Sequence, residues 1–252
     1  MIRRPPRSTQ SRSSAASDVY KRQTFNIFKM SILPRRFERI KNVLNCRMKN
    51  LTVLVEAVNK PHNLSAILRT CDAAGVFEAN FISEKDKVKT FNSTAQGSQK
   101  WVKLNNHETT ISAVSELKKK GFKLYGTTLN ERSTDYRNFD YSENTCFVLG
   151  AEKWGLSDQL ISKVDESIFI PMSGMVQSLN VSVAASILLF EAIRQRESKS
   201  LLPLKGEGLS AEEYEKTLFE WSYPELASIY RKSGNKYPKI NQYGEINEVV
   251  NN

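Results

Sequence analysis

The sequence predicts an α/β fold in which a mainly parallel β-sheet carries helices on both faces. Short apolar runs rich in β-branched and aromatic residues alternate with longer runs of helical periodicity, the pattern of a parallel sheet covered on both sides. The chain of 252 residues is 40% hydrophobic and 25% charged. That composition is typical of a globular protein with a sizeable core.

The strands and helices follow from the apolar periodicity of the chain. Strands are expected at 51–57, 78–83, 122–128, 145–151 and 166–171, and helices at 33–50, 63–74, 109–120, 157–164 and 178–196. Asn63 is expected to cap the helix that ends at Gly75. After residue 198 the pattern breaks, and a capping box of Ser210 with Glu213 predicts a further helical segment.

The net charge of +10 is concentrated at the start of the chain. Residues 1–29 contribute +6 of it, which leaves +4 for the remainder. This arm is rich in Ser, Arg and Gln, is expected to be disordered, and resembles translated cloning sequence. We therefore expect the natural protein to start at Met30. A basic RNA-binding tail is the alternative reading of the arm.

Cysteine and histidine usage argues against metal and disulfide chemistry. The three cysteines lie far apart with no CxxC spacing, and the chain has two histidines. No zinc site or disulfide framework is expected, and a reducing cytoplasm fits this usage. Cys71 and Cys146 are expected to be buried thiols. No membrane span is expected, because no apolar run reaches about 18 residues.

Three segments that follow predicted strands carry the polar residues of interest. They are "NLSAILRT" (63–70), "FVLGAEKWGLS" (147–157) and "IPMSGMVQSLNVSVAASILLFEA" (170–192). Ligand sites of parallel sheets lie beyond the carboxyl ends of the strands, where these segments are placed. Capping by Ser178 would explain one polar residue of the third segment but not Gln177 and Asn180. The second segment lacks the GxGxxG fingerprint of a dinucleotide-binding enzyme.

In order and spacing these segments resemble the SPOUT superfamily of RNA methyltransferases, in particular its SpoU/TrmH branch. The resemblance implies methyl transfer from S-adenosylmethionine to a ribose 2′-hydroxyl of RNA. It also implies a C-terminal deep trefoil knot that binds the cofactor, and a homodimer with the helix 178–196 at its interface. The small residues 181–186 fit such close packing of backbones.

The resemblance assigns site residues by position. Arg69 matches the catalytic arginine of the family, with Asn63, Glu152, Ser178 and Asn180 as its motif companions. The cofactor positions match Thr127, Gly150, Ile170 and Leu179. Arginine stays protonated in proteins, so a phosphate clamp is favoured over a free base for Arg69, and both roles stay open.

The flanks indicate which RNA is modified. The expected division is a non-native or disordered segment at 1–29, a basic helix at 30–50, a methyltransferase domain at 51–197 and a helical RNA-binding extension at 198–252. The basic residues Arg35, Arg36, Arg39, Arg231 and Lys232 are expected to bind RNA, with a solvated surface as the alternative. Only about 20 residues separate Met30 from the first strand, too few for an extra substrate domain.

Within the family that the chain resembles, a short N-terminal flank together with a C-terminal extension implies tRNA as the partner, modified at guanosine 18 of the D-loop. Another tRNA position, rRNA, and a non-catalytic RNA-binding module are the alternatives. A non-catalytic module would not need three intact site motifs. Binding of S-adenosylmethionine separates these classes.

Overall fold

The computed structural model describes residues 32–57, 60–82, 100–151, 154–203 and 208–246. The predictions for residues 1–29 and for Glu152 lie outside these ranges. The chain divides into two compact units, residues 42–214 and residues 1–41 with 215–252. Among the described residues, no helix is long and apolar enough to cross a membrane.

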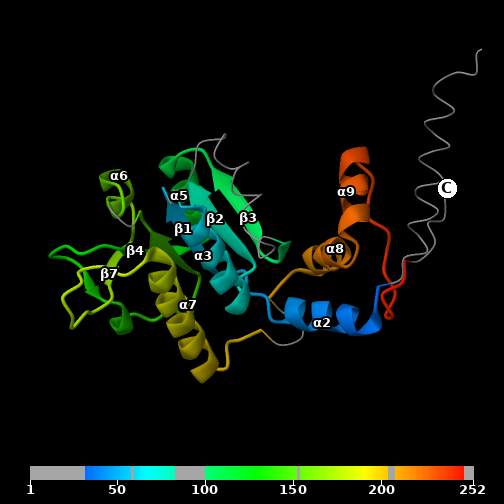
Figure 1. Cartoon of the computed structure of the whole chain (residues 1–252), viewed down its shortest axis with the longest axis horizontal. Helices are drawn as coiled ribbons and strands as arrows, with labels where there is room; N and C mark the ends of the chain where they lie inside the picture. The colour runs from blue at the N-terminus through cyan, green and yellow to red at the C-terminus, as the bar shows by residue number, and fades with distance from the viewer. Residues whose placement is uncertain (1–31, 58–59, 83–99, 152–153, 204–207, 247–252) are drawn as a thin grey trace, which may run out of the picture. The chain divides into compact units, whose positions relative to one another are not determined.

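Seven strands of the described chain form one sheet in the order β3-β2-β1-β6-β4-β7-β5, and every neighbouring pair is parallel (Figure 1). They are β1 (Leu51–Glu56), β2 (Glu78–Ile82), β3 (Lys103–His107), β4 (Lys123–Thr127), β5 (Thr134–Asp135), β6 (Thr145–Leu149) and β7 (Glu166–Phe169). The α/β fold class and the five predicted strands are confirmed, each end within two residues. β3 and β5 were not predicted.

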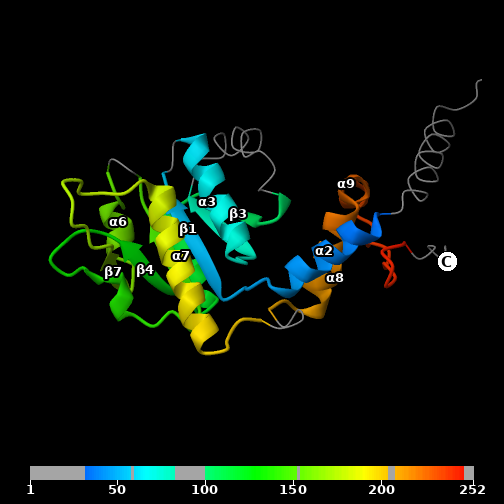
Figure 2. The ribbon, with the colours of Figure 1, turned by 60° about the horizontal axis from the view of Figure 1, so that its bottom comes forward.

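Helices cover both faces of this sheet, as the sequence predicts. On one face α3 (Pro61–Ala73) and α7 (Val181–Ser198) lie side by side, which Figure 1 and Figure 2 both show. On the other face lie α5 (Thr110–Lys119) and α6 (Asp158–Ile161). The strand side chains alternate between the two cores: Val53 and Val55 pack with α3 and α7, while Leu54 packs with α5 and α6.

Small side chains let α3 and α7 pack closely. The Thr70 and Ser186 hydroxyl oxygens lie 3.0 Å apart across the two helices. The Ser186 hydroxyl also donates to the Ser182 carbonyl at 2.8 Å, so the contact is satisfied within α7. Bulky side chains at these positions would separate the helices, since interiors pack without voids.

Two helix starts differ from the prediction. α3 begins at Pro61, with Lys60 in the N-cap position, so Asn63 is not a cap and lies buried in the first turn. Proline is favoured at the first helical position because it lacks the N–H that would be unpaired there. α7 begins at Val181, and its cap is Asn180, whose side chain accepts from the Ser182 N–H. Ser178 therefore lies outside the helix.

A buried arginine anchors the far end of α7 to the sheet. Arg196 has no exposed surface and donates to the main-chain carbonyls of Asn50, Tyr141 and Glu143 at 3.0, 2.9 and 2.7 Å. Its guanidinium also donates to the Asn50 side chain at 2.6 Å. Burial lowers the pKa of Arg196 to about 10. These bonds fix α7 against the amino ends of β1 and β6.

The second unit has an aromatic core. α8 (Ala211–Ser222) and α9 (Pro224–Ser233) contribute Phe219 and Tyr230, and Phe219 stacks on Tyr237 with ring centroids 4.7 Å apart. The Tyr223 hydroxyl donates to the Gly244 carbonyl. Gly244 has φ +87, and a Cβ there would lie 2.9 Å from Phe37 of α2 (Pro34–Asn45). The predicted capping box at the start of α8 is confirmed, since Ser210 and Glu213 bond reciprocally.

The cysteines lie as predicted in the part of the chain that the structure describes. Cys71 and Cys146 are buried free thiols, while Cys46 is exposed. Burial raises the pKa of Cys71 to about 12, which keeps this thiol protonated and unreactive near neutral pH.

Strand β3 was missed because all its side chains except Leu104 are polar. A buried network holds the last of them, His107: its Nε2 lies 3.0 Å from Asn80 Oδ1 of β2, and Asn80 in turn donates to the Thr52 hydroxyl of β1 at 3.0 Å. Hydrogen bonds of this kind remove the cost of burying polar groups. An edge strand can therefore be mostly polar and still contribute one buried side chain to the sheet.

This network predicts a pH dependence of stability. Burial lowers the pKa of His107, an effect that Lys120 reinforces and that Glu116 and Glu78 oppose. The unfolded chain then binds more protons than the folded protein near the ordinary histidine pKa, so stability falls as the pH drops through about 6.5. We expect the urea midpoint to fall between about pH 7 and pH 5, a range above most carboxyl pKa values. His107→Gln should flatten that fall. An unchanged slope in this variant would contradict the assignment.

Candidate functional site

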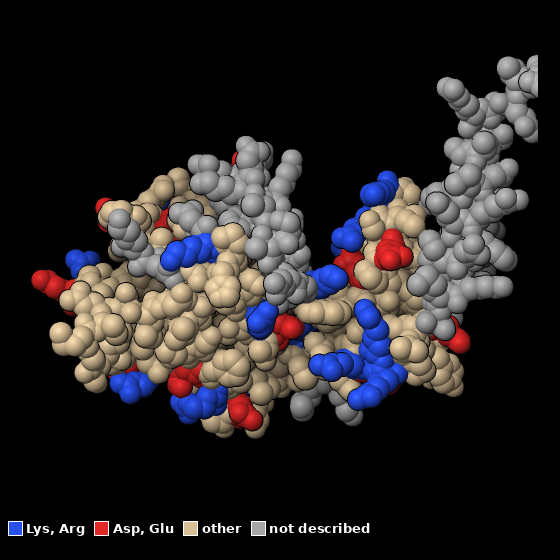
Figure 3. All heavy atoms as spheres, in the orientation of Figure 1, with Lys and Arg blue, Asp and Glu red and all other residues tan. Residues whose placement is uncertain are grey.

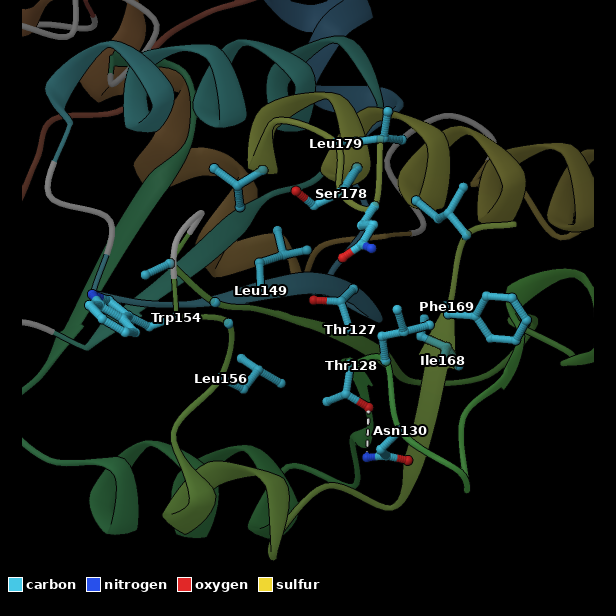
Figure 4. A pocket seen from close by; sticks show the side chains of 18 of the residues that line it. Thr127, Thr128, Asn130, Leu149, Trp154, Leu156, Ile168, Phe169, Ser178 and Leu179 are labelled. Carbon is cyan, nitrogen blue, oxygen red and sulfur yellow. Dashed lines mark hydrogen bonds between the residues drawn. The ribbon is translucent and has the colours of Figure 1, made fainter. Parts of the chain in front are cut away.

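A cavity of about 370 Å³ lies at the carboxyl ends of β4, β6 and β7. Its size falls within the range of small-molecule sites. The walls come from residues after β4 (127–130), after β6 (149–151 and 154–156), at the end of β7 (168–170 and 172) and at 177–179 with the first turns of α7. In Figure 4, Ser178 and Leu179 lie on one side, Trp154 and Leu156 on another, and Thr127 and Leu149 between them.

All four residues expected to hold a cofactor line this cavity: Thr127, Gly150, Ile170 and Leu179. Thr127 donates its hydroxyl hydrogen to the Val148 carbonyl at 3.0 Å, which ties the end of β4 to β6. The floor is apolar and includes Leu149 and Ile168. Such a cavity suits a flat apolar ring whose polar edge meets main-chain groups.

The loop after β6 depends on a close approach of two glycines. A Cβ on Gly150 would collide with the carbonyl group of Gly155 and lie 2.5 Å from the Leu156 nitrogen. The Ala151 N–H donates to the Gly155 carbonyl at 3.0 Å, and the Gly155 N–H donates to the Ala151 carbonyl at 2.8 Å. Gly155 has φ +67, which favours glycine. The close backbone approach predicted for these glycines is confirmed.

Two of the polar motif residues meet beside the start of α7. Asn180 Nδ2 donates to Asn63 Oδ1 at 3.1 Å, which joins the segment after β7 to α3. The Asn180 Oδ1 accepts from the Ser182 N–H and hydroxyl at 2.9 and 2.6 Å, so the cap fixes the orientation of the amide. Asn63 is buried, with 5% exposure. Ser178 and Gln177 line the cavity itself.

Arg69 lies apart from this cavity lining. Its side chain is exposed on α3, on the side away from the buried stripe, as the sequence predicts. A cation in this place is open to a large anionic partner but does not contact the cavity floor. Glu152, the remaining motif residue, lies outside the described residues.

Polar residues after β4 were missed by the sequence analysis. Asn130 Nδ2 donates to the Thr128 hydroxyl at 3.2 Å, which Figure 4 draws as a dashed line. The hydroxyl oxygens of Thr128 and Ser133 lie 2.9 Å apart. Thr128 and Asn130 line the cavity. The rule used for the other strand exits applies to this exit too, and would have found them.

The residues expected to bind RNA are all exposed. Arg35, Arg36 and Arg39 lie on α2, and Arg231 and Lys232 lie at the end of α9. Figure 3 shows Lys and Arg side chains gathered over α2. Of the basic residues on α2, Lys41 pairs with Glu38 at 2.9 Å.

Comparison with protein families matches nearly the whole described chain. Residues 50–190 match the SpoU rRNA methylase family, and residues 194–249 match the C-terminal family of SpoU rRNA methylases. The first match contains all three strand-exit segments up to residue 190.

Similar proteins match most of this chain. A protein of Thermus thermophilus, "tRNA (guanosine(18)-2'-O)-methyltransferase", is 50% identical over 74% of this chain and 95% of its own. The structure of the Aquifex aeolicus TrmH/SpoU tRNA modifying enzyme has a TM-score of 0.69 at 40% identity, covering 76% of this chain and 97% of its own. The SpoU methyltransferase AviRb of Streptomyces viridochromogenes, in complex with the cofactor AdoMet, has a TM-score of 0.53 at 27% identity, covering 62% of each chain.

The glycine contact predicts a sharp effect of one methyl group. Gly150→Ala forces apart the backbones at Gly155, and we expect the free energy of unfolding to fall by about 1–3 kcal/mol or more. Gly174→Ala is the matched control, because a Cβ there meets nothing within 4 Å. It should change stability by no more than about 0.5 kcal/mol. Equal urea midpoints for the two variants would contradict the close packing.

Proposed function

Because the chain belongs to the SpoU rRNA methylase family, we propose that it transfers a methyl group from S-adenosylmethionine to the ribose 2′-hydroxyl of guanosine 18 in tRNA. The observation that carries this proposal is the cavity lined by Thr127, Gly150, Ile170 and Leu179. The relative named for this reaction shares half of its residues with the chain over most of both lengths. A tRNA substrate supports the cytoplasm as the location of the activity.

The residues of the cavity fit S-adenosylmethionine. The apolar floor suits the adenine ring, and the tight turn at Gly150 leaves main-chain groups free of side-chain cover. Thr127, Gly150, Ile170 and Leu179 would hold the cofactor there. When bound, it supplies an activated methyl group on a sulfonium, which is the chemistry that protein side chains lack.

The protein's own contribution is positioning and charge placement. Arg69 clamps the phosphate next to the reacting ribose and orients the 2′-hydroxyl, because its guanidinium stays protonated and can bond a phosphate with two N–H groups. Asn180, held by Asn63 and by its own helix cap, presents a fixed polar edge beside the cavity. In this proposal a phosphate oxygen of the tRNA accepts the hydroxyl proton.

The fold of the site includes a deep trefoil knot in this proposal, with the chain after β7 threaded through a loop. The tight backbone contact at Gly150 and the return of residues 177–188 to the cavity support it. The contact between the small side chains of Thr70 and Ser186 supports it as well, because a threaded chain needs closely packed backbones. Threading of this kind is rare among folds.

The proposal divides the chain by task. Residues 51–197 carry the methyltransferase site, and the basic helix at 30–50 and the extension at 198–252 hold the tRNA. The exposed cations on α2 and at the end of α9 support this division. Non-specific phosphate contacts of this kind give affinity that depends steeply on salt.

The direct test of the function is nucleoside analysis of tRNA after incubation with S-adenosylmethionine and the protein. We expect 2′-O-methylguanosine at position 18. Arg69→Ala should lower the methyl transfer rate by about 10²–10³ or more, since charge placement of this kind is removed. Its affinity for S-adenosylmethionine should stay unchanged, because Arg69 does not line the cavity.

Arg137→Ala is the matched control for Arg69→Ala, because Arg137 is also exposed and pairs with Asp135. It should keep the wild-type rate. A methylated nucleoside at another position or in rRNA would replace the proposed substrate. Absence of any transfer would favour a non-catalytic RNA-binding module, and near-normal turnover of Arg69→Ala would remove the proposed role of this residue.

The basic surface of α2 gives a second test. Replacing Arg35, Arg36 and Arg39 by Ala should raise the KM for tRNA and reduce the slope of log affinity against log salt by about 2–3, because each phosphate that is no longer neutralised lowers the slope by about one unit. The Kd for S-adenosylmethionine should not change. Lys119→Ala, which removes an exposed cation at the end of α5, is the control. It should leave the KM for tRNA and the salt slope unchanged. A normal KM in the triple variant would contradict RNA binding by α2.

Assembly as a homodimer through α7 is part of the proposal. Phe190 and Val183 of α7 are 51% and 45% exposed in the single chain, which favours a further apolar partner on this helix. Sedimentation at micromolar concentration should give a dimer, and Phe190→Asp should shift it toward the monomer. A wild-type monomer under these conditions would defeat the assignment.

A further inference from the structure

A buried carboxylate lies at the carboxyl edge of the sheet beside the cavity. Glu56 is the last residue of β1, and its side chain is 9% exposed. Its Oε2 accepts the Ser157 N–H at 2.8 Å, and its Oε1 accepts the Ser157 hydroxyl at 2.8 Å and the Thr110 hydroxyl at 3.3 Å. Both oxygens are therefore used.

The hydrogen-bond partner of this carboxylate, Ser157, lies at the end of the loop that forms one wall of the cavity. Ser157 follows Leu156 directly, and its hydroxyl also caps α6 by accepting the Leu160 N–H at 3.2 Å. The loop begins on β6 at Leu149, which pairs with Val55 of β1. The start of the loop is thus paired with the residue just before Glu56 on β1. The end of the loop is bound to Glu56 itself through Ser157.

The backbone beside Glu56 adds a second constraint. Ala57 has φ +53, a left-handed conformation that costs energy for a residue with a side chain. Surrounding contacts must hold such a residue in place. The bonds of Glu56 supply contacts of this kind at the point where the chain turns from β1 toward α3 and Asn63.

From these contacts we propose that Glu56 is a positioning residue for the cofactor site, fixing the cavity wall formed by residues 149–151 and 154–156 through Ser157 without touching the ligand. The inference rests on the proposed function, because S-adenosylmethionine is the ligand whose affinity it concerns. A carboxylate suits the task because it accepts at both oxygens, whereas an amide has one acceptor oxygen and must turn its NH2 group toward either the Ser157 N–H or the hydroxyls of Ser157 and Thr110. A buried N–H or O–H group that loses its acceptor raises the free energy of the folded state. Ser157 would then be held less firmly beside the cavity.

A second buried glutamate of the sheet, Glu78, is the matched control, because replacing it removes a buried charge without affecting Ser157. Glu78 is the first residue of β2, is 4% exposed, and pairs with Lys103 and Lys120 at 3.3 and 3.2 Å. It lies at the amino end of its strand, away from the cavity lining. Thr110→Val is a second control, since it removes one bond to Glu56 from the α5 side and leaves both Ser157 bonds in place.

The test is calorimetric titration of the full chain with S-adenosylmethionine. Glu56→Gln should raise the Kd about tenfold or more, the effect of losing bonds to a buried charged group. Glu78→Gln and Thr110→Val should stay within about twofold of wild type, even where their melting temperatures fall. At saturating cofactor, the KM of Glu56→Gln for tRNA should remain that of wild type, which a general loss of structure would not leave intact.

Ser157→Ala tests the same interaction independently and serves if Glu56→Gln does not fold. It should raise the Kd for S-adenosylmethionine, and the double variant should bind no more weakly than Glu56→Gln alone, the sign of a shared interaction. Wild-type affinity in both Glu56→Gln and Ser157→Ala, or equal weakening by Glu78→Gln, would overturn the inference while the proposed function stood. A wild-type protein that does not bind S-adenosylmethionine would overturn both.

Discussion

The backbone of Gly150 comes so close to that of Gly155 that no side chain fits between them, and the cavity takes its shape from that contact. β6 is the central strand, paired with β1 and β4, so its carboxyl end is fixed from both sides. The chain must then turn back within a few residues, and only glycine permits the approach. The wall that results stands opposite the residues that begin α7, which leaves a space of ligand size between them.

The rest of the site follows from how helices are held to this edge. Arg196 anchors one end of α7 through main-chain carbonyls, and Asn180 caps the other end while bonding Asn63. α7 is thus tied to the sheet at its last turn and to α3 at its first. The Thr70–Ser186 contact keeps the two helices close between these points. Polar groups near the cavity can therefore hold one orientation without a ligand, which is the preorganisation that catalysis by positioning requires.

Much of this could be predicted from the sequence, and the failures have physical causes. Strands buried on both faces are apolar, so the five central ones were found, whereas β3 is polar and depends on partners such as Asn80. Asn63 was read as a cap because its residue type favours that place, but Pro61 sets the helix start two residues earlier. Glu56 escaped notice because its partners lie 54 and 101 residues away along the chain, and only the folded sheet brings them together.

A crystal structure of the full chain with S-adenosylmethionine would show directly whether the cavity is the cofactor site. We expect the adenosine in the cavity between the Gly150 turn and Leu179, with the methyl group directed toward the side on which Asn180 lies. We also expect that the chain after β7 passes through a loop before it enters α7. A cofactor bound elsewhere, or a chain that reaches α7 without threading, would contradict the assignment of this close-packed edge as the methyltransferase site.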